Sequence, residues 1–170
     1  MEKINPLDFE SRYYMFDEIN KAHFDGRLPR PEISIENFEN RNVVGENLLA
    51  VFSPPGLRCN VPTIRLPNEP GFYADIWEMA VAMAHEMIHY SNYLKGVDDI
   101  EMRGSIQWHT KAFADEAKQH NLYDWDFNLA GFSCDEDAED ERAEPSPIFA
   151  PCGFSDCIAC PDIDLSIYEI

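Results

Sequence analysis

Residues 78–92, EMAVAMAHEMIHYSN, place two histidines and a glutamate in a run of small and apolar residues. On an α-helix, positions four apart differ by about 40° around the axis, so His85 and His89 share one face. That spacing allows two ring nitrogens to bind one metal ion at about 2.0–2.1 Å. Glu86 is rotated by about 100° from His85 and could instead reach a water on the ion. The H-E-x-x-H pattern therefore predicts a metal site with Glu86 as general base.

Two histidines do not complete a catalytic zinc site, which usually has three protein ligands and one open position for water. The longer pattern H-E-x-x-H-x-x-G-x-x-H is excluded, because Asn92 stands where its glycine would be. Glu101 and Glu116, later in the chain, are candidate carboxylate ligands. His109 is the better candidate, since the twenty residues that separate it from the second histidine are enough to turn the chain back.

These residues need a scaffold, and the sequence predicts a helix at about residues 71–95 that stops at Gly96. An earlier helix is predicted to begin at Asn5, an N-cap residue followed by proline, and to end before Gly26. A third helix is predicted to begin at Ser105 and to carry His109 in its first turn.

Three short apolar runs between the first two helices predict strands at residues 32–38, 47–53 and 62–67. Pro62 and Pro67 flank the third run, which favours an edge position in the sheet. The expected fold is therefore α+β, with an N-terminal helix, a small three-stranded sheet, the H-E-x-x-H helix and a following ligand-bearing helix.

The net charge of the 170-residue chain is −19, and it is distributed unevenly. Residues 121–170 hold 13 acidic residues and one basic residue, whereas residues 1–120 hold 19 acidic and 12 basic. Because DNA repels such a chain on average, direct DNA binding is not expected. The absence of long apolar runs predicts a soluble, intracellular protein, cytoplasmic or nuclear, with no membrane contact. The odd cysteine count favours reduced thiols or metal ligands over a disulfide framework. A monomer is the favoured oligomeric state.

Three segments, NKAHFDGRLPRPEISI, MAVAMAHEMIHYSNYLKG and WHTKAFADEAKQHNL, together resemble the SprT-like zinc metalloprotease domain. The similarity spans about residues 5–125, and FDGRLP and the His-x-x-x-Phe spacing are its most distinctive parts. That family includes Spartan-type proteases, which cleave proteins crosslinked to DNA. The resemblance implies a zincin-like SprT fold, a zinc ion held by His85, His89 and His109, and Glu86 as the catalytic base.

The expected domains are a SprT-like metalloprotease domain at residues 1–130, an acidic linker at 131–147 and a cysteine-containing tail at 148–170. The chain departs from the family here, because many members end in a zinc ribbon with two cysteine pairs and basic segments. Two further departures are the acidic character of this tail and Thr110, which follows the third histidine where the family commonly has glycine.

Four late cysteines, spaced C-x17-C-x4-C-x2-C, could bind a second, structural zinc ion. They are Cys134, Cys152, Cys157 and Cys160. Two alternatives stay open: free thiols on a partly ordered tail, or one tail thiolate that occupies the open position of the first zinc and inhibits the enzyme.

The predicted function is a zinc-dependent endopeptidase for protein or peptide substrates, with DNA-associated proteins included by the resemblance. Glu86 is expected to take a proton from the attacking water and deliver it to the leaving amine. The substrate is expected to lie along an edge strand, at residues 48–53 or 62–66. Three residues are candidates for a second oxyanion donor: Tyr90, Tyr93 and Arg103.

A second interpretation is a catalytically inactive binding module that keeps the metal as a structural staple. Its acidic tail would then engage a basic or DNA-binding partner. Glu86 argues against this interpretation, because a purely structural metal site gains nothing evident from a base at that position.

Overall fold

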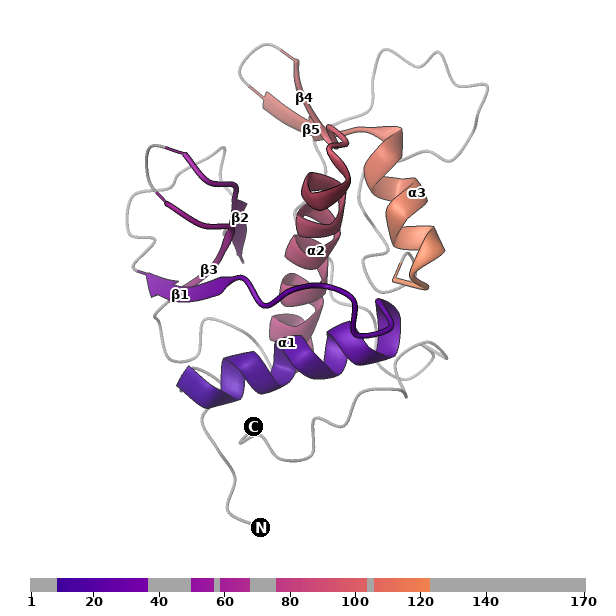
Figure 1. Ribbon diagram of the computed structural model, residues 1–170. Helices are drawn as coiled ribbons and strands as arrows, with labels where there is room; N and C mark the ends of the chain where they lie inside the picture. Colours follow the sequence, from indigo (N-terminus) through magenta and orange to yellow (C-terminus); the bar gives the residue numbers. More distant parts are fainter. Residues whose placement is uncertain (1–8, 37–49, 57–58, 68–75, 104–105, 123–170) are drawn as a thin grey trace.

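The computed structural model of the chain describes residues 9–36, 50–56, 59–67, 76–103 and 106–122 (Figure 1). The helices in these ranges are α1 (Phe9–His23), α2 (Ile76–Lys95) and α3 (Lys111–Gln119). The strands are β1 (Glu32–Glu36), β2 (Val51–Ser53), β3 (Thr63–Pro67), β4 (Ile100–Arg103) and β5 (Ile106–His109). The predicted α+β class is confirmed, and a two-stranded β4–β5 hairpin is added to the predicted three-stranded sheet.

The three-stranded sheet has the order β1-β3-β2, with β1 parallel and β2 antiparallel to β3. The prediction that residues 62–67 form an edge strand is therefore wrong. Pro62 precedes β3, where its carbonyl accepts a hydrogen bond from the Glu32 amide at 3.0 Å, and Pro67 is the last residue of the strand. Neither proline removes an N–H from the interior of the ladder, so β3 can lie in the centre.

Helix α2 lies between the sheet and α3, and it also contacts α1 (Figure 1). Helices buried on several sides are apolar around most of their circumference, which explains the Ala- and Met-rich sequence of α2. Side chains from all these elements meet in one core, in which Phe16, Ile64, Leu66, Met83 and Phe113 are fully buried. Among the described residues, no helix has both the length and the apolar character that crossing a membrane requires.

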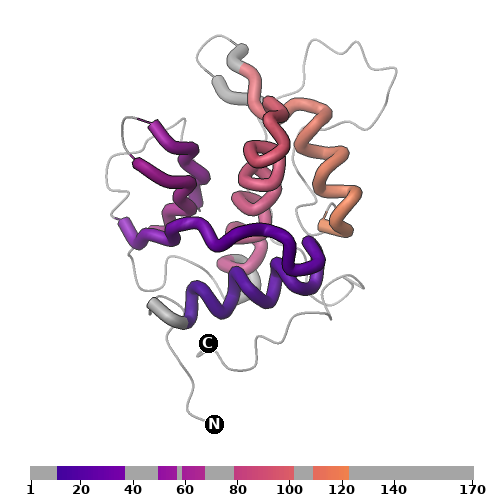
Figure 2. The backbone as a smooth tube through the Cα atoms, in the orientation of Figure 1, coloured from indigo at the N-terminus to yellow at the C-terminus, as the bar shows by residue number. Residues whose placement is uncertain are grey.

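The segment after α1 turns sharply before the chain enters β1, as the backbone trace shows (Figure 2). Asn20 fixes this turn, because its amide side chain accepts from the Leu28 N–H at 3.1 Å and donates to the Leu28 carbonyl at 2.9 Å. Gly26 has a φ of +67°, a conformation that glycine adopts without steric cost. The predicted end of the first helix is therefore confirmed, whereas its predicted start at Asn5 lies outside the described residues.

The prediction that His109 lies in the first turn of a helix is wrong. His109 is the last residue of β5 and pairs with Ile100 of β4. Thr110 then has an extended backbone, with φ −87° and ψ 172°, and α3 begins at Lys111. The Thr110 amide donates to the Asp99 carbonyl at 2.8 Å. This bond prolongs the pairing of the two strands, so the helix begins one residue later. The predicted start at Ser105 lies outside the described residues.

Candidate metal centre

Three imidazoles from two elements converge at one point beside α2. The Nε2 atom of His89 lies 3.2 Å from Nε2 of His85 and 3.2 Å from Nε2 of His109. One ligand atom from each of the three rings lies within 4.8 Å of the others. The structure thus brings together the three histidines that the sequence singled out, although the third comes from a strand.

The spacing of these nitrogens fits a metal ion. Two nitrogen ligands about 2.05 Å from a tetrahedral ion would be about 3.3 Å apart, close to the 3.2 Å observed. Burial, and then repulsion by His85 and His89, holds the pKa of His109 well below its ordinary value. A neutral ring keeps the lone pair that a metal requires. The three histidines can therefore hold a metal ion, and they make up the one such group found among the described residues.

Phe113 of α3 packs against all three imidazoles. Its ring centroid lies 4.7 Å from that of His85, 4.6 Å from that of His89 and 4.1 Å from that of His109. Phe113 is fully buried, so it shields the histidine rings from solvent on the side of α3. The His-x-x-x-Phe spacing in the sequence reflects this packing.

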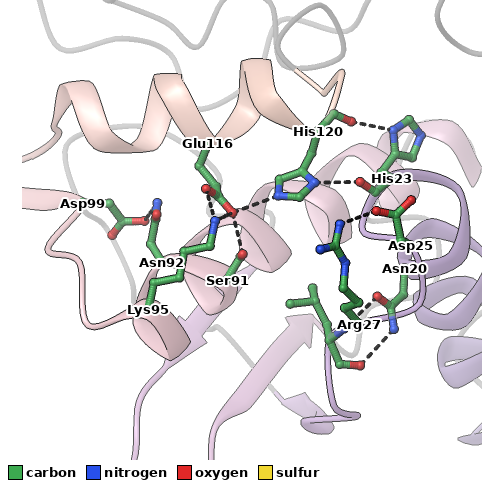
Figure 3. A network of polar contacts seen from close by, with 11 residues as sticks. Asn20, His23, Asp25, Arg27, Ser91, Asn92, Lys95, Asp99, Glu116 and His120 are labelled. Carbon is green, nitrogen blue, oxygen red and sulfur yellow. Dashed lines mark hydrogen bonds and ion pairs between the residues drawn. The ribbon is translucent and has the colours of Figure 1, made fainter.

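Asp99 orients the second histidine, and sequence reasoning missed it. Its Oδ2 atom accepts hydrogen bonds from His89 Nδ1 and from Asn92 Nδ2, both at 2.9 Å (Figure 3 shows the bond from Asn92). Because a carboxylate accepts, the proton of His89 lies on Nδ1, and the Nε2 lone pair faces the other two rings. Histidines that bind metals commonly donate their second N–H to a carboxylate in this way.

The turn after α2 brings Asp99 to that position. Gly96 has a φ of +69°, and its amide donates to the Tyr93 carbonyl at 3.0 Å, while the Val97 amide donates to the Asn92 carbonyl at 2.9 Å. This is the Schellman arrangement that commonly ends helices at a glycine. The only sequence signal was the glycine stop followed three residues later by an aspartate.

We call His85, His89 and Asn92 the metal face of α2, and Glu86, Tyr90 and Tyr93 its aromatic face. Glu86 is buried, and its Oε2 atom accepts a hydrogen bond from the Phe52 amide of β2 at 2.5 Å. The carboxylate is therefore held beside the metal face but is directed toward the sheet. Glu86 is accordingly not a member of the histidine group.

Glu116 is not part of the histidine cluster. It accepts hydrogen bonds from Ser91 Oγ at 2.5 Å, from Lys95 Nζ at 2.7 and 2.6 Å, and from His120 Nε2 at 2.9 Å (Figure 3). Burial raises the pKa of Glu116, but the hydrogen bonds from Lys95 and Ser91 and the charges of His120 and Lys95 outweigh it and hold this pKa below its ordinary value. His120 also donates from Nδ1 to the His23 carbonyl at 2.7 Å.

The other sequence candidates are placed as follows. Glu101 is exposed on β4 and is not in the histidine group. Tyr90 is buried on the aromatic face, where burial, and then repulsion by Tyr93, raises its pKa, so it keeps its hydroxyl proton. The side chain of Arg103 lies outside the described residues. The acidic linker also lies outside the described residues, as do the four tail cysteines, Cys134, Cys152, Cys157 and Cys160.

Burial separates the two candidate oxyanion donors on the aromatic face. Tyr90 is 3% exposed, whereas Tyr93 is 41% exposed. A donor to a developing oxyanion is most effective in a site that excludes water. Of the two, Tyr90 is therefore the one that is shielded from water.

Comparisons of the chain with known protein families, with curated proteins and with solved structures find no match.

Proposed function

We propose that this protein is a zinc-dependent endopeptidase. The observation that carries the proposal is the convergence of three imidazoles, in which Nε2 of His89 lies 3.2 Å from Nε2 of His85 and 3.2 Å from Nε2 of His109. The buried Glu86 lies on the same helix as the first two histidines. Three neutral nitrogen ligands are a common set for catalytic zinc. The resemblance to SprT-like domains supports the same reaction and makes DNA-associated proteins the first substrates to test.

In this proposal His85, His89 and His109 hold the zinc, and Asp99 fixes the ring orientation of His89. Zinc held by three imidazoles supplies a water that is activated near neutral pH and a positive charge that polarises a peptide carbonyl. Glu86 accepts the proton of the attacking water at a carboxylate oxygen and transfers it to the leaving amine nitrogen.

The sheet offers one edge to an extended substrate next to Glu86. Residues 62–66 belong to the central strand β3, so they cannot provide it. On β1, the outward Ile33 amide donates to the Tyr13 hydroxyl of α1 at 3.1 Å. On β2, the outward Phe52 amide donates to Glu86 Oε2 at 2.5 Å. Both amides therefore have side-chain partners, but the β2 edge is the one that contacts the proposed base. We therefore assign the substrate to the β2 edge, where it would replace Glu86 at the Phe52 amide and add a strand.

Glu86→Gln tests the proposed chemistry. The variant should keep the wild-type zinc content, because Glu86 is not in the histidine group, and should lose about 10²- to 10⁴-fold in kcat, the usual contribution of a general base. Glu101→Gln, on the exposed surface of β4, is the matched control and should retain both zinc and activity. Cleavage of casein and of DNA-associated proteins is measured with and without a chelator, and with and without DNA.

The result that would reject the proposal is cleavage by Glu86→Gln at the wild-type rate. If wild-type protein with one bound zinc cleaves nothing under any of these conditions, the inactive metal-stapled binding module is the better interpretation. Binding of a basic partner that depends strongly on salt and is unaffected by Glu86→Gln would then support the role of the acidic tail.

A further inference from the structure

The aromatic face of α2 continues from the catalytic glutamate toward the end of the helix. Glu86, Tyr90 and Tyr93 are related by steps of four and three residues, so they lie in one row. The ring of Phe52 on β2 packs across this row, with its centroid 5.6 Å from that of Tyr90 and 5.7 Å from that of Tyr93. Three aromatic rings from two elements thus form one surface that begins at Glu86.

This surface is buried at one end and open at the other. Tyr90 is 3% exposed, whereas Tyr93 is 41% exposed, and Phe52 is half-buried. A solitary exposed tyrosine is ordinary on a protein surface. Tyr93, however, is continuous through Phe52 with a backbone amide that contacts the proposed base. The open end of the aromatic surface therefore lies where a substrate strand that replaces Glu86 at that amide can reach it.

The pairing geometry of β2 selects one side chain of such a substrate. In an added strand, the residue paired with Phe52 directs its side chain to the same face of the sheet as the Phe52 ring. The Phe52 ring faces α2, where Tyr90 and Tyr93 lie. The two neighbouring substrate residues point to the opposite face, because side chains alternate along a strand. One substrate position therefore meets the aromatic surface.

We infer that Phe52 and Tyr93 form a specificity subsite for a large apolar or aromatic side chain next to the scissile bond. The inference rests on the proposed endopeptidase function. The substrates would be extended polypeptides with a large apolar or aromatic side chain at the position paired with Phe52. Contact of the Phe52 amide with Glu86 places this position beside the reacting carbonyl. Tyr93 is thus a specificity residue, separate from the metal ligands and the base.

The test uses the full chain loaded with zinc and two fluorogenic peptides that differ at one position, phenylalanine or serine. We expect wild-type protein to cleave the phenylalanine peptide with a kcat/KM about 10- to 100-fold higher, the range that an apolar pocket provides. Tyr93→Ala should reduce this ratio to within about threefold of unity, and Tyr93→Phe should restore it. Leu94→Ala is the matched control, since Leu94 is similarly exposed at 46% but lies about 100° away around the helix.

The outcomes separate this inference from the proposed function. Cleavage of both peptides at equal rates by wild-type protein leaves an endopeptidase without this subsite and overturns the inference. An unchanged preference in Tyr93→Ala does the same. Failure of wild-type protein to cleave any peptide or protein rejects the endopeptidase and the subsite together. Loss of activity in Tyr93→Phe on both peptides would make the Tyr93 hydroxyl an oxyanion donor and would also overturn the assignment.

Discussion

Replacement of Asp99 by asparagine is expected to weaken zinc binding while leaving the proposed base in place. Asp99 Oδ2 accepts from His89 Nδ1 and Asn92 Nδ2, each at 2.9 Å, and the Asp99 side chain is 11% exposed. Asparagine has the same shape and one carbonyl oxygen, so it can keep the geometry of these bonds. It loses the negative charge that strengthens them, and the amide group that replaces the second oxygen cannot accept a hydrogen bond.

The magnitude follows from the change in hydrogen-bond type. A hydrogen bond to a charged group contributes about 1.5–3 kcal/mol, against about 0.5–1.5 kcal/mol for a neutral one. Asp99→Asn should therefore weaken zinc binding by about 1–1.5 kcal/mol, because the ring of His89 is oriented less firmly. This loss corresponds to a zinc Kd roughly tenfold higher. Asp99→Ala removes both bonds, and we expect a Kd up to about 100-fold weaker, the upper range for groups that orient metal ligands.

The assay is competition for zinc against chelators of graded affinity at constant pH. Asp98→Asn is the matched control, because Asp98 is exposed. The hydrogen bond from Thr110 Oγ1, at 3.2 Å, reaches the backbone carbonyl of Asp98, so the substitution does not remove it. Nitrogen NMR of the metal-free protein provides a second measurement, since the Nδ1 proton of His89 should become less well defined in Asp99→Ala. Equal zinc affinities for wild type, Asp99→Asn and Asp98→Asn would show that Asp99 does not hold the ring.

His109→Ala should lose at least as much zinc affinity as Asp99→Ala, because it removes a proposed ligand and not only a residue that orients one. Zinc content is measured by atomic absorption, and an unchanged content would refute the three-histidine site. Glu116→Gln should lower the free energy of unfolding by about 1–3 kcal/mol at pH 7, because a buried and hydrogen-bonded carboxylate is lost. The folded-state pKa of Glu116 lies below the ordinary 4.5, so its stabilisation is present above pH 4.5 and disappears as the pH falls through the folded value. Denaturant unfolding should thus show wild type and Glu116→Gln converging at acid pH, and a constant difference would contradict this cause. Asp115→Asn, an exposed neighbour, is the control.

The metal face could be predicted because it depends only on local geometry. Once residues 76–95 are helical, a spacing of four residues brings His85 and His89 together whatever surrounds the helix. The position of His109 required a long-range contact. The sequence named it as a candidate, and the structure places it in the histidine group, but the predicted element was wrong. Four-residue strands such as β4 and β5 carry too few residues for a period of two to be told from a helical period.

The position of β3 and the role of Asp99 could not be predicted for different reasons. Flanking prolines limit only the N–H groups that they replace, and whether a strand lies at an edge depends on which partners reach it. β3 pairs with both β1 and β2, and its Ile64 and Leu66 side chains are fully buried in the core, as expected for a central strand. The position of Asp99 depends on the direction the chain takes after Gly96. The glycine indicated where the helix ends, but it did not indicate which later side chain the turn would bring to His89.

For the proposed endopeptidase, the two faces of α2 imply that metal retention and turnover would depend on different parts of the fold. The metal face is supported by Asp99 and by the Phe113 ring of α3, whereas Glu86 is held from the opposite side by the Phe52 amide of β2. Substitutions that disturb β2 should therefore reduce kcat/KM at constant zinc affinity. Substitutions in the turn after α2 should reduce zinc affinity first. A variant of β2 that lost its zinc before its activity would show that α2 transmits changes between the two faces, and the separation argued here would not hold.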